Sequence, residues 1–324
     1  MAARPLWLAP IIAALALLAS PAPRLGAETV ATVVRGVEPD GSERLLEDVA
    51  LLWRAHLAYD GSALTVRQQA DPRARLQAVR LGRALFAVLG ADAYAALRPD
   101  YPDVAVLSVL GPVPVHVLSR SEPGPLRAVP DTIVFTAHAF FAADAFAQFA
   151  AAGAPLLPPP ARRSVDPLGA IELLRRGVPP DMVVLIAVPV GTRELAAALA
   201  ADPALRLRPL AAELQEAVTR DRPWVFNTSI PRGTYPNQAD ALDAPSTQLL
   251  LVTLPQLPQD DAKRMLDCLY GRRDLVVPVN PLFALVDRRA NTEVAKWAPY
   301  HATAMKEFGI VPAPPAPPAV PGTP

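Results

Sequence analysis

The residues best suited to chemistry lie in one short loop, Ser229 to Gln238, which reads Ser-Ile-Pro-Arg-Gly-Thr-Tyr-Pro-Asn-Gln. Its prolines fix φ on either side of the turn, and Gly233 gives access to backbone conformations that a side chain forbids. Apolar, strand-like segments precede and follow the loop, so we expect buried strands to hold it. Such a loop presents Thr234 and Tyr235 in a fixed pose, either to a ligand, to a partner or to a neighbouring helix.

The elements that position this loop alternate between strand and helix. Strand-like runs of β-branched and apolar residues occupy Glu28–Val34, Leu64–Gln68, Ala84–Leu89, Val104–Val109, Val113–Leu118, Thr132–Thr136, Asp181–Pro189, Leu205–Leu210 and Thr247–Leu254. Helical spacing occupies Ser42–Leu57, Pro72–Leu81, Ala91–Leu97, Ala142–Ala152, Pro167–Arg176, Arg193–Ala201, Ala211–Thr219, Gln259–Tyr270 and a stretch near Asn280–Arg288. The alternation predicts an α/β protein with a mainly parallel sheet covered on both faces.

Length and composition set the broad class. A chain of 324 residues exceeds the usual size of one hydrophobic core, so two compact units are expected. Lysine plus arginine equals aspartate plus glutamate at 31 each, so no net field favours nucleic acid or an anionic membrane. The single cysteine, Cys268, lies on a helical pattern among apolar residues, which favours a small buried hydrophobe over a nucleophile.

The N-terminus has the pattern of a secretory signal. Arg4 precedes an uncharged run from Pro5 to Pro23, and the small residues up to Ala27 suit cleavage there. The alternative is an uncleaved membrane anchor, although the run is near the lower length limit for spanning a bilayer and contains prolines. We therefore expect an exported protein in the periplasm, with anchoring by the same segment as the alternative.

Three stretches of the C-terminal half match the motifs of one known family. Ile230 to Gln238 resembles an Ile-Pro-x-Gly-Thr-Tyr-Pro-Gly-Gln loop, and Thr247 to Leu269 resembles the strand and long helix that follow it. Pro299 to Ile310 resembles a closing element that ends in Glu-x-Gly-Ile. By these motifs the chain resembles the TAXI family of TRAP-type transporter solute receptors, which are bacterial periplasmic binding proteins. Weaker similarity extends over roughly Glu28 to Val311.

The resemblance implies a type II periplasmic binding protein fold, with two α/β lobes joined by two hinge crossings. The signal peptide expected from the N-terminal pattern covers residues 1–27, and the resemblance implies a discontinuous first lobe over 28–119 and 228–311 with an inserted second lobe over 120–227. Residues 312–324 contain seven prolines and no apolar periodicity, so we expect them to form a disordered tail.

A ligand site between the lobes is also implied. Its candidate residues come from four loops: Thr234, Tyr235, Ser42, Arg44, His138, Thr192 and Arg193. Two of these loops depart from the family pattern, since Asp40 to Arg44 replaces a glycine-rich loop and Thr136 to Phe141 contains no glycine. Alternatives stay open: Tyr235 could pack under its own loop, both arginines could lie on solvated helix faces, and His138 could plug a vestigial cleft.

The function implied is capture of a small organic acid or amino acid by hinge closure, followed by delivery to a TRAP-type membrane permease subunit. The alternative is a degenerate receptor retained as a periplasmic interaction or signalling protein. The sequence contains no Gly-x-Ser-x-Gly elbow, phosphate loop or dinucleotide fingerprint, so we expect neither an enzyme nor a cofactor. His56 and His116 lack metal-ligand spacing, and His301 in the closing motif is expected to make structural hydrogen bonds.

Overall fold

The computed structural model describes residues 30–36, 42–56, 63–120, 124–271, 277 and 284–311. The expected signal peptide, the Pro-rich tail, part of the first loop at Asp40 and Gly41, and the first four residues of the helical stretch predicted over Asn280–Arg288 lie outside these residues. Within the described ranges, no helix combines the length and the apolar character that crossing a membrane would require.

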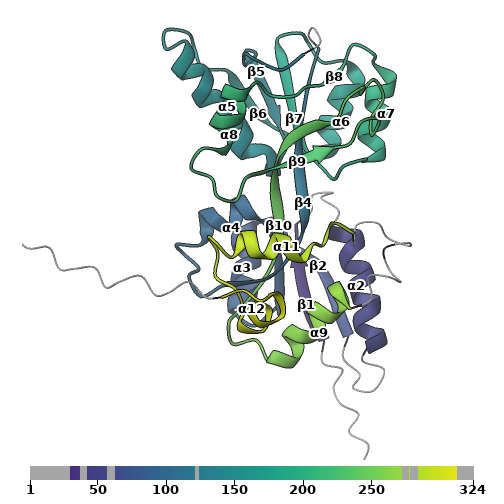
Figure 1. Ribbon diagram of the computed structural model, residues 1–324, viewed down its shortest axis with the longest axis vertical. Coiled ribbons are helices and arrows are strands. Elements are labelled where there is room, and N and C mark those ends of the chain that lie inside the picture. The colour runs from purple at the N-terminus through teal and green to yellow at the C-terminus, as the bar shows by residue number, and fades with distance from the viewer. Residues whose placement is uncertain are drawn as a thin grey trace, which may run out of the picture.

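The first lobe is built on a sheet in the strand order β2-β1-β3-β10-β4 (Figure 1). β1 (Val30–Arg35) pairs in parallel with β2 (Ala63–Gln68) and β3 (Phe86–Gly90), and β10 (Leu242–Thr253) pairs antiparallel with β3. The helices of this lobe are α2 (Ser42–His56), α3 (Pro72–Arg80), α4 (Ala91–Leu97), α9 (Gln259–Tyr270), α11 (Arg288–Val294) and α12 (Ala302–Phe308).

The second lobe continues the same sheet. β5 (Thr132–Phe135) pairs in parallel with β6 (Ala161–Ser164) and β7 (Met182–Ala187). The short strand β8 (Arg206–Leu207) pairs antiparallel with β4. On one side lie α5 (Phe140–Gly153), which follows the short 3-10 helix η1 (Ala137–Ala139), and α8 (Ala212–Thr219); on the other lie α6 (Pro167–Arg176) and α7 (Arg193–Ala201) (Figure 1).

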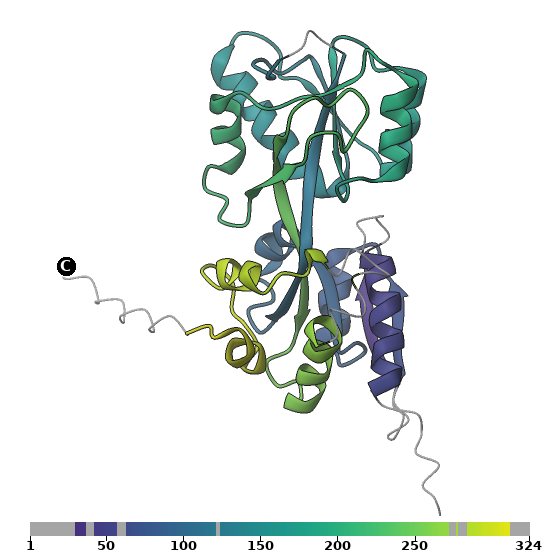
Figure 2. The same cartoon turned by 45° about the vertical axis from the view of Figure 1, so that its right-hand side comes forward.

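Two long strands join the lobes (Figure 2). β4 (Ala105–Ser119) pairs antiparallel with β10 up to Pro114 and then antiparallel with β7 from Val115 onward. The sequence predicted two separate runs here, which is wrong, because the strand continues through Gly111 at φ +150° while the register with β10 shifts at Leu249. β4 and β10 pair antiparallel with their neighbours in both lobes, so the sheet is mixed, and the prediction of a mainly parallel sheet holds only for β2-β1-β3 and β6-β5-β7.

These elements confirm the expected fold class, in which two α/β lobes are joined by two crossing strands as in type II periplasmic binding proteins. β9 (Phe226–Ile230) pairs antiparallel with the first part of β10, so the loop from Ser229 to Gln238 closes a hairpin. Ile230 and Tyr235 pack in an apolar cluster with residues of β7 and α7, which ties this hairpin to the second lobe.

The core is dense in both lobes. A large cluster includes fully buried side chains such as Phe86, Leu107 and Phe146, with Trp53 at 1% exposure. Cys268 is 2% exposed in this cluster, and burial raises the pKa of its thiol to about 12. The prediction that Cys268 is a small buried hydrophobe is therefore confirmed.

Side-chain caps fix several helix starts. Asp71 and Asp166 accept hydrogen bonds from backbone N–H groups of α3 and α6, each with proline at the first helical position. His301 caps α12, since its Nδ1 accepts from the Thr303 N–H at 3.2 Å while its Nε2 faces the Leu257 carbonyl at 3.2 Å. The structural role expected for His301 is confirmed.

Candidate functional site

The two lobes meet where their parallel strands end. β3 ends at Gly90 and leads directly into α4, while β5 ends at Phe135 and leads through Thr136 into the 3-10 helix η1. In open α/β sheets the carboxyl ends of parallel strands are the usual place for a ligand, because loops and helix starts converge there. The facing strand ends of the two lobes therefore form the first candidate site.

His138 of the second lobe lies against the first lobe at this place. A Cβ atom placed on Gly90 would lie 2.9 Å from His138 Nδ1 and 2.3 Å from Asp92 Oδ1, so only glycine leaves room for both side chains. His138 is 7% exposed. Desolvation raises the pKa of the Asp92 carboxyl above its usual value, and the charge of His138 offsets part of this rise. The buried Asp92 Oδ1 has no hydrogen-bond partner among the described residues.

A second polar centre surrounds Tyr235. Its hydroxyl accepts a hydrogen bond from the Gly191 N–H at 2.9 Å and lies 2.8 Å from His116 Nε2. His116 Nδ1 faces the Ile186 carbonyl at 3.3 Å, which requires the proton on Nδ1 and leaves Nε2 to accept from the tyrosine. Burial lowers the pKa of His116 to about 4, so the ring is neutral at pH 7. Tyr235 thus links the hairpin loop, the crossing strand β4 and the loop after β7.

The hairpin loop is held by its own hydrogen bonds. Gly233 has φ +72°, which explains the glycine, and its N–H donates to the Gln238 carbonyl at 3.1 Å. The Gln238 carboxamide accepts from the Tyr235 N–H and donates to the carbonyls of Ile230 and Asp240. Thr234 Oγ1 donates to the Pro231 carbonyl at 2.7 Å. The hydroxyls of Thr234 and Tyr235 are therefore both engaged within the protein.

The remaining predicted residues lie at helix starts. Ser42 is the first residue of α2 and is 1% exposed, while Arg44 is exposed on the same helix. Thr192 precedes α7 and donates to the Pro189 carbonyl at 2.7 Å, and the exposed Arg193 begins that helix. The structure brings the Thr192 loop to Tyr235 through Gly191. No hydrogen bond or ion pair joins Arg44 to another predicted residue in the described part of the chain.

Sequence reasoning missed two members of these centres. Asp92 falls within the predicted helix Ala91–Leu97 and was not singled out, although a buried strand that ends in Gly90 and leads into a helix was a usable signal. His116 was considered only as a metal ligand. Among the described residues, no group of His, Cys, Asp and Glu side chains is arranged to hold a metal ion.

Comparison by sequence gives no relative. No protein-family model matches the chain. A search of the curated proteins also finds no match.

Comparison by structure gives distant alignments. An ABC-type phosphate transport receptor from Vibrio cholerae aligns at a TM-score of 0.43 with 10% identity, covering 78% of this chain and 98% of that one. The alkanesulfonate-binding protein SsuA from Xanthomonas axonopodis pv. citri, bound to MOPS, aligns at 0.41 with 12% identity, covering 88% and 81%. The periplasmic VFT2 domain of BvgS from Bordetella pertussis aligns at 0.43 with 13% identity, covering 80% and 94%.

Proposed function

We propose that the chain is the solute receptor of a TRAP-type transporter, related to the TAXI family, and captures a small organic acid or amino acid between its lobes. The observation that carries the proposal is the meeting of two sets of strand ends, at Gly90 and Asp92 on one lobe and His138 on the other, across a joint formed by β4 and β10. The protein acts by capture and delivery, without chemistry on the solute.

Hinge closure supplies the mechanism. A ligand that contacts both lobes binds the closed state better than the open one, so it shifts the population toward closure. The crossing strands offer a place for the bend, since the register between β4 and β10 shifts beside Gly111, whose φ of +150° favours glycine. The transporter's membrane subunit would then recognise the surface of the closed lobes.

An acid would find cations at the helix starts. Arg193 begins α7 and Arg44 lies in the first turn of α2, and neither is ion-paired with a carboxylate of the described residues. Their charge is therefore available to an anion. The motif-bearing loop supports the TAXI assignment, and the signal-like N-terminus supports a periplasmic location next to a TRAP permease.

Ligand-induced stabilisation tests the proposal. We would screen glutamate, succinate and benzoate by thermal unfolding, where a ligand at about a hundred times its Kd should raise the midpoint by about 5 °C. Arg193→Ala should reduce the shift, and Arg175→Ala, which removes an exposed charge from α6, should not. If none of the acids stabilises the protein, the proposed function is wrong.

The second candidate is a degenerate receptor that serves as an interaction or signalling protein. The observation that favours it is the position of His138, which fills space against Gly90 and Asp92. If this candidate is right, removing the side chain in His138→Gly does not make the protein bind any of the acids. A pull-down from periplasmic extract then recovers a stable partner other than a TRAP permease. Acid binding by the wild-type protein would exclude this candidate.

A further inference from the structure

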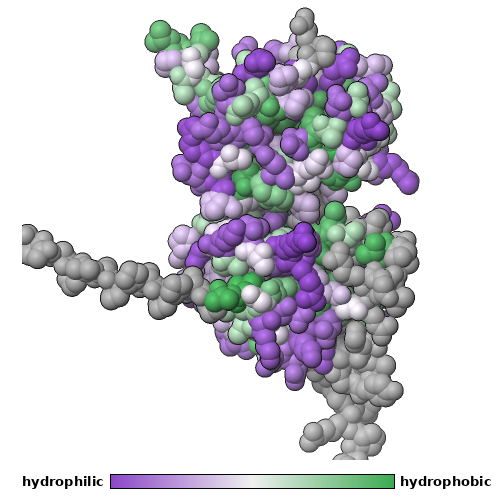
Figure 3. Space-filling model, in the orientation of Figure 1, coloured by the Kyte–Doolittle hydropathy of each residue, from purple (hydrophilic) through white to green (hydrophobic). Residues whose placement is uncertain are grey.

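A cavity of about 580 Å³ opens at the joint, and His138 is not among the residues that line it. Its walls come from both lobes, with Trp224 and Val225 from the segment before β9 and with α11 and Trp297 from the first lobe. Gln248 of the crossing strand β10 also lines it. The segment before β9 lies on the side of the second lobe that faces α4 and α11, where the molecule narrows (Figures 1 and 3). We call this cavity the tryptophan groove.

Gln248 is the unusual residue of the groove. Its side chain is 7% exposed, on a strand whose neighbours Leu249 and Leu250 are core residues. Within the described residues its carboxamide makes no hydrogen bond, although it carries two donors and an acceptor. Among the described residues, this carboxamide is not one of the fully buried polar groups that lack a partner, so its atoms are open to the groove, where a polar group of a ligand can pair with them.

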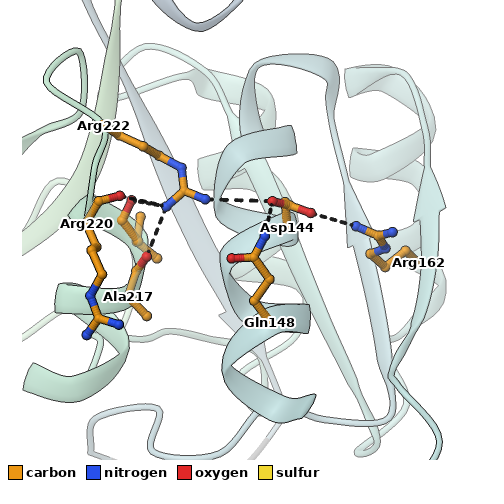
Figure 4. A network of polar contacts seen from close by, with 7 residues as sticks. Asp144, Gln148, Arg162, Ala217, Arg220 and Arg222 are labelled. Carbon is orange, nitrogen blue, oxygen red and sulfur yellow. Dashed lines mark hydrogen bonds and ion pairs between the residues drawn. The ribbon is translucent and has the colours of Figure 1, made fainter. Parts of the chain in front are cut away.

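The wall formed by Trp224 is held rigidly. The turn before it is anchored by Arg222, which donates to the carbonyls of Ala217, Val218 and Arg220 at 3.1 to 3.2 Å and reaches Asp144 of α5 at 3.7 Å (Figure 4). Asp144 in turn pairs with Arg162 at 3.1 Å. The indole of Trp224 then packs edge-on against Phe141, with ring centroids 5.3 Å apart.

The opposite wall is fixed to the first lobe. Asn291 of α11 accepts a hydrogen bond from the Val109 N–H of β4 at 2.8 Å. The ring centroids of Trp297 and Tyr94 lie 6.1 Å apart. The backbone carbonyl of Trp297 accepts a hydrogen bond from the Arg98 side chain at 2.6 Å. Both tryptophans are only partly buried, so each offers ring surface to the groove.

One cation at the rim is left without an acid. Lys296 pairs with Glu293 at 2.5 Å, and Asp287 caps α11 by accepting from the Arg289 N–H at 3.0 Å. The exposed guanidinium of Arg289 has no carboxylate partner among the described residues. The groove therefore combines two aromatic walls, an unpaired amide and a cation.

We propose that the tryptophan groove binds a planar aromatic acid that carries a second hydrogen-bonding group. The ring lies against Trp224 and Trp297, the polar substituent pairs with Gln248, and the carboxylate faces Arg289. The inference rests on the proposed function only in taking the ligand to be an acid whose binding favours one arrangement of the lobes. It identifies the class of acid and a site that the hairpin motif does not predict.

4-Hydroxybenzoate is the probe, with benzoate and phenol as partial ligands that lack one polar group each. Binding is measured by quenching of tryptophan fluorescence, because Trp224 and Trp297 lie in the groove while Trp53 is buried in the first lobe. Gln248→Leu should weaken 4-hydroxybenzoate about tenfold and leave benzoate almost unchanged. Arg289→Ala should weaken both acids and leave phenol unchanged, whereas the control Arg175→Ala should change none of the three.

Three results would overturn the inference, and the first two concern affinity. One is the absence of saturable quenching by 4-hydroxybenzoate and benzoate in the wild-type protein. The other is equal affinity in Gln248→Leu, Arg289→Ala and the Arg175→Ala control. Trp224→Phe keeps a ring at the wall, so it should bind better than Trp224→Ala, and the reverse order would also contradict the proposal.

The same variants separate this inference from the proposed function. If glutamate or succinate stabilises the protein equally in wild type and in Gln248→Leu, and aromatic acids do not bind, the groove is not the site while the receptor function stands. If 4-hydroxybenzoate binds in the groove without changing the radius of gyration in solution scattering, the site stands and capture by closure fails.

Discussion

Removing one oxygen atom from Tyr235 tests how the motif-bearing loop is held. In Tyr235→Phe the ring keeps its edge-on packing against His116, with centroids 5.3 Å apart. The variant loses the hydrogen bond from the Gly191 N–H at 2.9 Å and the one to His116 Nε2 at 2.8 Å. The change therefore isolates the polar linkage from the apolar packing.

The two lost partners do not cost the same. His116 is fully buried, so its Nε2 is left without a partner, which costs about 1–3 kcal/mol. Gly191 is exposed, so water replaces the tyrosine at its N–H and little is lost. We expect the free energy of unfolding to fall by about 2 kcal/mol and the midpoint to fall by about 5 °C.

Denaturant unfolding followed by circular dichroism measures this difference. Tyr101→Phe is the matched control, since that buried ring has its hydroxyl 3.5 Å from the Arg73 carbonyl, at the limit of a hydrogen bond. It should change the unfolding free energy by less than about 0.5 kcal/mol. If Tyr235→Phe is as stable as Tyr101→Phe, the hydroxyl does not hold the loop and the reasoning is wrong.

Three further predictions concern the buried groups. The pKa of His116 is about 4 in the folded protein and 6.5 when exposed, so the unfolded state binds more protons between these two pH values. The free energy of unfolding should therefore fall by about 3 kcal/mol in total as the pH falls through this range. Urea unfolding at pH 7 and pH 4.5 measures the loss, and equal stability at both pH values would contradict it. The Cys268 thiol, with its pKa raised to about 12, should not react with Ellman's reagent until the protein unfolds, and rapid labelling of the native protein would argue against its burial. Leu107→Ala should cost about 3 kcal/mol of unfolding free energy by denaturant titration, because the fully buried side chain leaves a cavity, while Leu51→Ala on the exposed face of α2 should cost much less.

Much of the architecture follows from local pattern. The helix from Pro72 was predictable from Asp71, which caps it, and from the spacing of Leu76 and Val79, which are both buried. The continuous strand β4 that joins the lobes was not predictable, because Gly111, Pro112 and Pro114 indicate a break between two strands. Pairing with β10 overrides these local preferences. Gly111 adopts a φ of +150°, and Pro112 and Pro114 both lie within the part of β4 that pairs with β10.

The candidate site was less predictable, since its contacts join distant parts of the chain. Tyr235 could be singled out from its loop, yet only the fold shows that its hydroxyl meets His116, 119 positions away. Asp92 and His138 come together from different lobes, and no spacing within one segment indicates that contact. A lone histidine or aspartate in a sequence carries little information until the fold gives it a partner.

The hairpin and the tryptophan groove are connected through β10. Tyr235 ties the hairpin of β9 and β10 to the loop after β7, so the start of β10 moves with the second lobe. Trp224 precedes β9 on that same side, whereas Trp297 follows α11 on the first lobe. The separation of the two indoles therefore depends on the angle between the lobes, and a ligand held by both binds one angle better than the others. That difference in affinity is what a hinge needs in order to respond to a ligand at all.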